Sequence, residues 1–527
     1  MTKPGIASSI VPGRLTPRSM SAFVPIPLGQ PIPNTPHAVS CSLPTMRAVH
    51  GYEQKNPDIV KHMSSGYPRF VLHPFAQRLS AHYRTRSSQP DKTLWLTSSA
   101  QIGAELIALL ASPTTNQSEV ATATHFSADG INGVSHPDTP ELNNRAKRFL
   151  QNTGGFLSSR AAEDQLVQLG LLDAAPAEAL FSGDALTEVR RHLQPLFPGT
   201  TVEDILPATC GMNALYAAFR TLAERQAAKG RTVWVQLGWV YLDTIALLKR
   251  FAPAPDDYVH LPDIFDLPAL ELLFSAQGNR IAGLIIEAPT NPLLQTPDLA
   301  KIALLARSYD ARIIIDPSVS SPFSVDVLSH ADIVTASLTK YAASEGDLMA
   351  GLVVVNPHTP QAPELRRQIA ARLEPVYPRD LSRLALEIGN TRQVLRQIET
   401  SVPLIAAWLE AHPAVKSVTW AHDPASRANY EKIARTSESV GSMIGFTLHR
   451  PLEDFYDRLR LPKGPSFGMK TTLICPFMYL AHYDLVSTEA GRAELSASGI
   501  DPDLLRMSVG CEPADEIISA LAEALTQ

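Results

Sequence analysis

The stretch from Arg312 to Gly351 constrains the fold of this 527-residue chain more than any other. Three consecutive isoleucines, 313–315, predict a buried strand that ends at Asp316, and the β-rich run 333–336 predicts a second strand that leads into Lys340. The carboxyl ends of neighbouring parallel strands meet at one edge of a sheet, where α/β proteins bind ligands. We therefore expect Asp316 and Lys340 to face one crevice of an α/β fold with a mostly parallel sheet.

A carboxylate and a lysine in one crevice are the two groups that a cofactor with an aldehyde and a pyridine ring requires. The lysine amine binds the aldehyde, and the carboxylate keeps the ring nitrogen protonated so that the ring withdraws electrons. Ser337 and Thr339 are expected to hydrogen-bond a cofactor phosphate. For an isolated Asp or Lys, a strand-end turn residue and a solvated lysine are the commoner interpretations, but the surrounding motif favours the site.

That motif resembles the pyridoxal-phosphate-dependent enzymes of Cys/Met metabolism, which carry D-N-T-x-x-S-P followed by S-x-T-K-Y-x-x-G-H-x-D-x-x-x-G. The residues that match are Asp316, Ser321, Pro322, Ser337, Thr339, Lys340, Tyr341, Asp347 and Gly351. Pro317 and Ser318 replace the usual Asn-Thr, while Ser344 and Glu345 replace the usual Gly-His. The resemblance implies pyridoxal 5'-phosphate as cofactor, and no replacement removes a group that this cofactor's chemistry requires.

Composition excludes several function classes. A net charge of −6 gives no reason to expect a nucleic acid or an anionic membrane as partner. No apolar run approaches the roughly 18 residues that span a bilayer. Four widely spaced cysteines without a C-x-x-C pair predict neither a disulfide framework nor a metal site. Small-molecule chemistry in a reducing, cytoplasmic compartment fits this composition.

Residues 1–40 contain eight prolines and no acidic residue, which predicts a flexible arm. The basic residues Lys3, Arg14 and Arg18 are also typical of an organelle transit peptide, although the prolines argue against its amphipathic helix. Residues 41–145 are expected to fold as an extension with a strand at 94–96, a helix at 100–111 and a long loop at 113–140. Its segments SLPTxxxxxGYE and GYPRF resemble the longer, fungal-type cystathionine γ-synthases.

An arginine upstream of the main domain is a second element that the resemblance implies. In most family members a Tyr-x-Arg sequence holds the cofactor phosphate of a neighbouring subunit. Ser158-Ser159-Arg160 aligns with it, with Ser158 in place of the tyrosine, whereas Tyr67-Pro68-Arg69 keeps both residues and is a rival. A guanidinium binds phosphate oxygens bidentately. A surface or salt-bridged arginine is the alternative for either.

The stretch 205–223 predicts a strand end, a tight turn at 210–212 and a helix. A helix start offers unpaired N–H groups, and a glycine lets the backbone approach an anion. A plain strand-to-helix connection would explain one glycine equally well. Because Cys210-Gly211-Met212 resembles the family's S-G-M turn, we predict that Gly211 and Met212 bind the phosphate.

Tyr241 and Thr244 match the family's Tyr-Gly-Gly-Thr, with Leu242 and Asp243 in place of the glycines. The family's tyrosine stacks on the cofactor ring and takes part in proton transfer, so Tyr241 is predicted to be catalytic beside Lys340. Stacking on a ring contributes about 0.5 to 1.5 kcal/mol. A core tyrosine is the alternative, with Trp239 as a possible substitute.

Two further motifs complete the predicted site. A buried strand at 281–286 leads into Glu287–Pro292, which resembles the family's E-x-P-x-N-P and implies that Asn291 hydrogen-bonds the ring oxygen. Alone, N-P is a turn signal. The helical pattern at 298–311 completes a βαβ unit.

Near the C-terminus, R-x-S-V-G-x-E is matched at 506–512 and implies that Arg506 binds the α-carboxylate of an amino-acid substrate. Ser466 matches a serine near the same carboxylate. Pro465 stands where cystathionine-forming members often have glutamate, so recognition of a second substrate does not carry over.

The predicted fold is α/β, the type I aminotransferase-like fold of pyridoxal-phosphate-dependent transferases. Its expected regions are a Pro-rich arm at 1–40, the extension at 41–145, a cofactor-binding domain at 146–375 and an α+β domain at 376–527. A long helical stretch at 365–412 is expected to join the last two.

The resemblance implies a cystathionine γ-synthase that makes cystathionine from O-acylhomoserine and cysteine for methionine biosynthesis, working as a homodimer or homotetramer. O-acylhomoserine sulfhydrylase and cystathionine γ- or β-lyase are alternatives with the same cofactor chemistry. A silent relative that acts as an interaction protein is a further alternative, motivated by the replaced motif residues.

Overall fold

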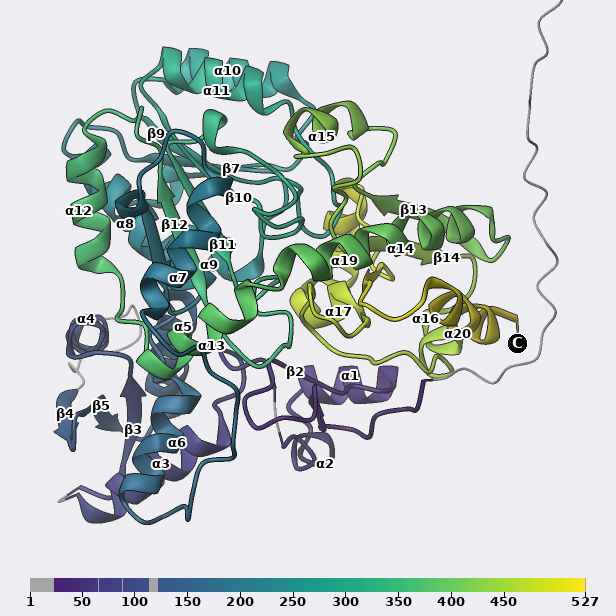
Figure 1. The fold of residues 1–527 in the computed structure, drawn as a ribbon. Coiled ribbons are helices and arrows are strands. Elements are labelled where there is room, and N and C mark those ends of the chain that lie inside the picture. Colours follow the sequence, from purple (N-terminus) through teal and green to yellow (C-terminus); the bar gives the residue numbers. More distant parts are fainter. Residues whose placement is uncertain (1–22, 65, 88, 113–121, 527) are drawn as a thin grey trace, which may run out of the picture.

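The computed structural model describes residues 23–64, 66–87, 89–112 and 122–526. A seven-stranded sheet and a four-stranded sheet stand beside each other, and a three-stranded sheet lies below the larger one (Figure 1). Among the described residues, no helix is long and apolar enough to cross a membrane, and no cluster of three metal-ligating side chains occurs.

The seven-stranded sheet is mostly parallel, as predicted. Only β12 runs antiparallel to both of its neighbours, β11 and β6. The order across the sheet is β6 (Ile205–Ala208), β12 (Gly351–Val355), β11 (Ile333–Ser337), β10 (Arg312–Asp316), β9 (Ile281–Glu287), β7 (Val233–Leu237) and β8 (Tyr258–Leu261).

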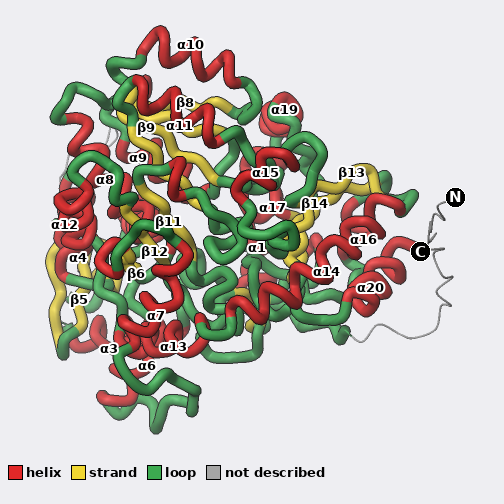
Figure 2. The backbone as a smooth tube through the Cα atoms, turned by 45° about the horizontal axis from the view of Figure 1, so that its top comes forward, coloured by secondary structure: helices red, strands yellow, loops and turns green. Residues whose placement is uncertain are grey.

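Both faces of this sheet are buried, which explains the unbroken isoleucine run. In β10, Ile314 joins the core under α8, whereas Ile313 and Ile315 join the core on the opposite face. Helices surround the strands in Figure 2. The first core includes side chains of α5 (Pro140–Thr153), α8 (Gly211–Ala227), α9 (Leu242–Phe251) and α12 (Ala362–Arg372). The second includes those of α7 (Ala185–Leu193), α10 (Leu267–Gln277) and α11 (Leu299–Ser308).

The carboxyl-terminal sheet is antiparallel, in the order β13 (Val415–Trp420), β14 (Met443–Leu448), β16 (Leu505–Ser508) and β15 (Leu473–Pro476). The helical stretch that joins it to the main domain is not one helix. It comprises α12, α13 (Pro378–Ile388) and α14 (Thr391–Ala411), because Pro378 starts a new helix and Gly389 follows the end of α13. The other helices of the carboxyl-terminal region are α15 (Arg427–Ile433), α16 (Leu452–Tyr456), α17 (Phe477–Ala481), α18 (Tyr483–Val486), α19 (Glu489–Ala497) and α20 (Ala514–Thr526).

The amino-terminal extension contains the predicted strand and helix, as β3 (Lys92–Thr97) and α4 (Ala100–Ala111). The prediction of a long loop at 113–140 is wrong for the described part of this segment. There, β4 (Thr124–Ala128) and β5 (Ile131–Pro137) form a hairpin that pairs with β3. Asp129 and Gly130 connect the strands with φ of 52° and 80°, the backbone of a tight hairpin turn. The remaining helices here are α1 (Met46–Glu53), α2 (Pro57–Val60), α3 (Pro74–Arg86) and α6 (Ser159–Gln168).

Part of the predicted flexible arm is ordered. Within 23–40, β1 (Pro31–Ile32) pairs with β2 (Ser40–Cys41), and Ile32 and Val39 are fully buried. The Val39 N–H donates to the Gly346 carbonyl at 2.8 Å. The prolines therefore shape an extended segment that packs on the body, while the rest of the predicted arm, 1–22, lies outside the described residues.

Candidate active site

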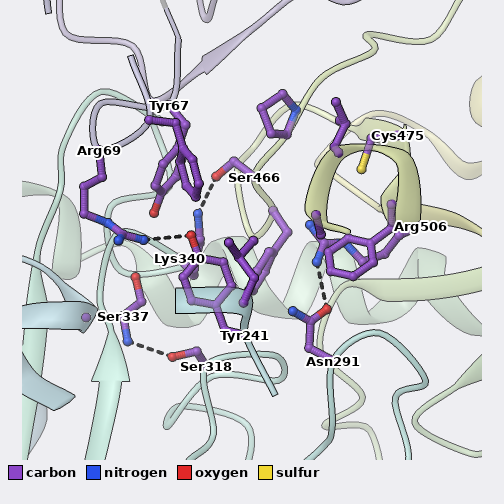
Figure 3. A pocket seen from close by; sticks show the side chains of 18 of the residues that line it. Tyr67, Arg69, Tyr241, Asn291, Ser318, Ser337, Lys340, Ser466, Cys475 and Arg506 are labelled. Carbon is purple, nitrogen blue, oxygen red and sulfur yellow. Dashed lines mark hydrogen bonds between the residues drawn. The ribbon is translucent and has the colours of Figure 1, made fainter. Parts of the chain in front are cut away.

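A cavity of about 150 Å³ opens where β9, β10 and β11 end. Its lining comes from the extension, the main domain and the carboxyl-terminal domain, segments far apart in the sequence (Figure 3). Sequence analysis predicted this edge of the sheet as the site, and the structure places the cavity there.

Lys340 lies in the middle of this cavity (Figure 3). Its side chain is 7% exposed, and its Nζ donates to Ser466 Oγ at 2.6 Å. Burial, together with the positive charges of Arg506 and Arg69, lowers the Lys340 pKa well below its usual value. The shift favours the neutral amine, the form that attacks an aldehyde.

One end of the cavity is suited to an anion. Gly211 and Met212 begin α8, whose first N–H groups have no partner within the helix. A Cβ added at Gly211 would come within 2.9 Å of the Ser337 Cβ, so only glycine allows this close approach. The Ser337 N–H donates to Ser318 Oγ at 2.7 Å. These residues form a compact phosphate-sized cradle.

Thr339 differs from its predicted role. Its hydroxyl donates to the Ala350 carbonyl at 3.3 Å and accepts from the Ala350 N–H at 2.9 Å. The side chain is buried and is not part of the described cavity lining. Thr339 therefore fixes the loop that carries Lys340 instead of facing a phosphate.

Arg69 lies at the same end as the cradle, together with Tyr67 and Tyr241 (Figure 3). Its guanidinium donates to the Tyr241 hydroxyl at 2.8 Å and to the Asp243 carboxylate at 2.5 Å. Asp243, which replaces a family glycine, also accepts from Gln151 at 2.7 Å. The Lys340 amine lies 4.7 Å from the centre of the Tyr67 ring. The Tyr-x-Arg pair therefore faces the lysine of its own chain.

Arg160 lies in a cluster of carboxylates within its own chain. Its side chain is 1% exposed and forms ion pairs with Glu178 at 2.9 Å, Asp380 at 3.2 Å and Asp347 at 3.6 Å. Three carboxylates occupy its guanidinium, and it is not part of the lining of the Lys340 cavity. Of the two arginines left open by the sequence, Arg69 is the one at the cradle.

Two carboxylates meet at the ends of β9 and β10. Asp316 and Glu287 are paired residues across these strands, and Asp316 accepts from the Ser318 N–H at 2.8 Å. Burial raises the Asp316 pKa to about 6. Burial and the neighbouring Asp316 charge raise the Glu287 pKa well above its usual value. Glu287, which sequence analysis did not assign, lines the cavity, whereas Asp316 lies behind the lining residue Ser318. A pyridinium close to Asp316 would favour its ionised form.

The opposite end of the cavity is built around Arg506 (Figure 3). Its guanidinium donates to Asn291 Oδ1 at 2.8 Å and lies 4.1 Å from the centre of the Phe477 ring. The bond uses the Asn291 carbonyl and leaves the amide NH₂ as the donor that could serve a ring oxygen. Arg506 has the reach and charge to bind a carboxylate there.

A third part of the lining was not predicted at all. It comprises Leu43, Tyr52 and Glu53 of the extension and Leu480 and Ala481 of α17. These segments are packed together, since the rings of His50 and Tyr479 lie 5.3 Å apart. We call this part of the lining, together with Phe477, the extension wall. Only the segment SLPTxxxxxGYE, which contains Leu43, Tyr52 and Glu53, was a sequence signal for it.

The donor set fits pyridoxal phosphate. The phosphate could be held by Gly211, Met212, Ser337 and Arg69. Lys340 could bind the aldehyde, and Asp316 could pair with the ring nitrogen. The model of the Cys/Met metabolism PLP-dependent enzymes matches residues 199–526. The chain belongs to this family. Its cofactor is pyridoxal 5'-phosphate, and its fold is the one that the sequence predicted.

Two relatives that match over nearly their full length are named for different reactions. The chain is 36% identical to the L-2-amino-4-chloropent-4-enoate dechlorinase/desaturase of Streptantibioticus cattleyicolor, over 94% of this chain and 97% of the relative. It is 29% identical to the cystathionine gamma-synthase of Neurospora crassa, over 95% and 98%. The resemblance to longer fungal-type enzymes is thereby confirmed.

Solved structures support the fold. A cystathionine gamma synthase from Xanthomonas oryzae pv. oryzae superposes with a TM-score of 0.55 at 23% identity, over 66% of this chain and 86% of that one. The part of this chain outside the superposition is a third of its length.

Proposed function

We propose that this protein is a pyridoxal-phosphate-dependent enzyme that expels a leaving group from Cγ of an α-amino acid, with cystathionine γ-synthase-like chemistry. The observation that carries the proposal is the position of the buried Lys340 amine, whose pKa is lowered, between an anion cradle and Arg506. This spacing suits a phosphate at one end and a substrate carboxylate at the other.

Each residue has a defined task in this proposal. Arg506 binds the substrate carboxylate and thereby fixes which bond at Cα stands perpendicular to the cofactor ring. When bound, pyridoxal phosphate withdraws electrons from Cα. Lys340 removes the Cα proton and then moves a proton from Cβ, so that the group on Cγ can leave. Tyr241, whose hydroxyl accepts from Arg69, assists proton transfer and covers the ring.

The first candidate reaction is γ-replacement: cysteine displaces the acyl group of O-acylhomoserine and gives cystathionine, a step towards methionine. The similarity to the Neurospora crassa enzyme supports it. The second candidate is γ-elimination, in which the leaving group departs without a replacement. The dechlorinase relative supports this candidate, because the chlorine in its named substrate is on carbon 4, which is Cγ.

The proposal also includes assembly as a homo-oligomer, in line with the family resemblance. Light scattering of the purified protein tests this part. A sulfhydrylase and a γ-lyase share the Cα and Cβ proton steps, whereas a β-lyase shares only the Cα step, so the experiment below separates the β-lyase from the others.

The test is proton exchange in heavy water. The holoenzyme should exchange the Cα and Cβ protons of L-norvaline, which has no leaving group, and should release acetate from O-acetyl-L-homoserine. Lys340→Ala is the matched control and should do neither. A wild-type protein that binds pyridoxal phosphate but exchanges no Cα proton from any amino acid would contradict the proposal and favour the silent relative.

A further inference from the structure

We propose that the cavity selects amino acids whose γ-substituent is compact and uncharged, and that it offers no binding place for a second amino acid. This inference rests on the proposed function. It names the substrate class and, of the two candidate reactions, favours γ-elimination.

The first observation is the number of cations. In the described part of the chain, three cationic side chains line the cavity: Arg69, Lys340 and Arg506. Arg69 is paired with Asp243 at the phosphate cradle, and Lys340 is the amine that would hold the cofactor. Of the cations that this chain itself supplies, Arg506 therefore remains for one carboxylate. A substrate with two carboxylates, or a second amino acid, would leave one carboxylate without a counter-charge.

The second observation is the apolar character of the remaining lining. Beyond Arg506 and its neighbour Phe477, the extension wall continues with Leu480, Ala481 and Leu43. Phe70 and Leu242 add further apolar side chains to the cavity lining. Burying a carboxylate against such a surface without a partner costs several kcal/mol. A short alkyl, alkenyl or halogen-bearing γ-carbon would instead gain from burial there.

Glu53 is the acidic residue of the extension wall, at the end of α1. Two lysines act on its charge from outside the cavity lining, Lys55 and Lys147. The Lys55 amine donates to the Tyr52 carbonyl at 3.1 Å. Because both lysines lie outside the lining, the extension wall itself supplies no cationic side chain for an acyl carboxylate.

In the favoured reaction the Cγ–X bond breaks and X leaves with the bonding electron pair. The substrate also loses one proton, so the net change is the loss of HX. No second reactant enters, which agrees with the absence of a fourth cation in the described lining.

The experiment compares two amino acids of similar length that lack a leaving group, L-norvaline and L-glutamate. Calorimetric titration of the holoenzyme should give a dissociation constant at least about tenfold lower for norvaline. Leu480→Lys adds a cation to the half-buried face of α17 and should reverse the preference. Glu53→Gln should improve glutamate binding several-fold, and Asp58→Asn, an exposed acid on α2, should change neither value.

Glutamate that binds the wild-type holoenzyme as tightly as norvaline would overturn the selection of uncharged substituents. If cystathionine were the main product from O-acetylhomoserine plus cysteine, the proposal that the cavity has no second amino-acid site would be wrong. The proposed function would survive both results, because norvaline exchange in heavy water tests it separately.

Discussion

The cofactor end of the cavity and the extension wall are built in different ways. Apart from Tyr67 and Arg69 of the extension, the cofactor end comes from residues at strand ends and the start of α8, each close in sequence to a strand of one sheet. The extension wall comes from α1 and α17, more than 400 residues apart in the chain. The comparison indicates that cofactor chemistry is encoded in short local motifs, whereas substrate choice depends on how distant segments pack.

The largest expected effect concerns the origin of Arg69. Because it lies in the cavity of its own chain, coexpression of Arg69→Ala and Lys340→Ala chains should restore no activity. If a partner subunit supplied Arg69, mixed oligomers would contain intact sites, and activity would return. Measurement of the turnover of purified mixed oligomers, with wild-type and Arg69→Ala chains coexpressed as the positive control, decides between the two.

Arg506→Met tests the end of the cavity that is proposed to bind the substrate carboxylate. Loss of the only guanidinium beside Asn291 should lower kcat/KM by about 10²- to 10³-fold, since truncating a buried charge partner costs roughly 2–5 kcal/mol. Pyridoxal phosphate should still bind, because the cradle is untouched. Arg460→Met, whose guanidinium is paired with Glu523, is the matched control. Equal losses of cofactor and substrate binding would contradict the separation of the two ends.

Asp243→Asn tests the cofactor end, with a smaller expected effect. Without the carboxylate, Arg69 loses its buried partner, and the dissociation constant for pyridoxal phosphate should rise about tenfold. Norvaline binding to the saturated holoenzyme should change little. Equilibrium dialysis of the cofactor measures this effect, with the exposed Asp256→Asn as control. An unchanged cofactor affinity would mean that Asp243 does not position Arg69.

Glu53→Gln should have the smallest effect, and its sign depends on pH. Burial raises the Glu53 pKa to about 7 from its ordinary 4.5, so the folded state holds this proton more tightly than the unfolded chain does. The stability loss caused by Glu53 therefore grows from pH 4.5 to above pH 7. The variant should be more stable than wild type at pH 8 by on the order of 1 kcal/mol, with little difference at pH 4.5. Thermal unfolding at both pH values checks this, and a gain only at the acidic pH would contradict it.

Much of the fold and of the cofactor end could be predicted from the sequence. Hydrophobic periodicity and short motifs depend only on residues that are close together in the chain. The isoleucine run of β10, the Lys340 motif and the Gly211 turn each indicated its structure without reference to distant residues. The hairpin at Asp129-Gly130 was missed although its dipeptide is a strong turn signal, because the polar residues around it were interpreted as loop.

The rest depended on tertiary packing. The sequence left both Arg160 and Arg69 as candidates, and only the structure shows that Arg160 is surrounded by carboxylates of its own chain. Thr339 lies in a matching motif, yet its hydroxyl is taken by Ala350. The extension wall could not be deduced, because nothing in the sequence near Glu53 indicates that α17 will lie beside it.

The most direct test of the account is to identify the cofactor-bearing residue. The holoenzyme would be reduced with borohydride, digested, and mapped by mass spectrometry. We predict one phosphopyridoxyl group, on Lys340, and none in the Lys340→Ala variant. A label on another lysine, or no label in a protein saturated with pyridoxal phosphate, would contradict the assignment of this cavity as the active site.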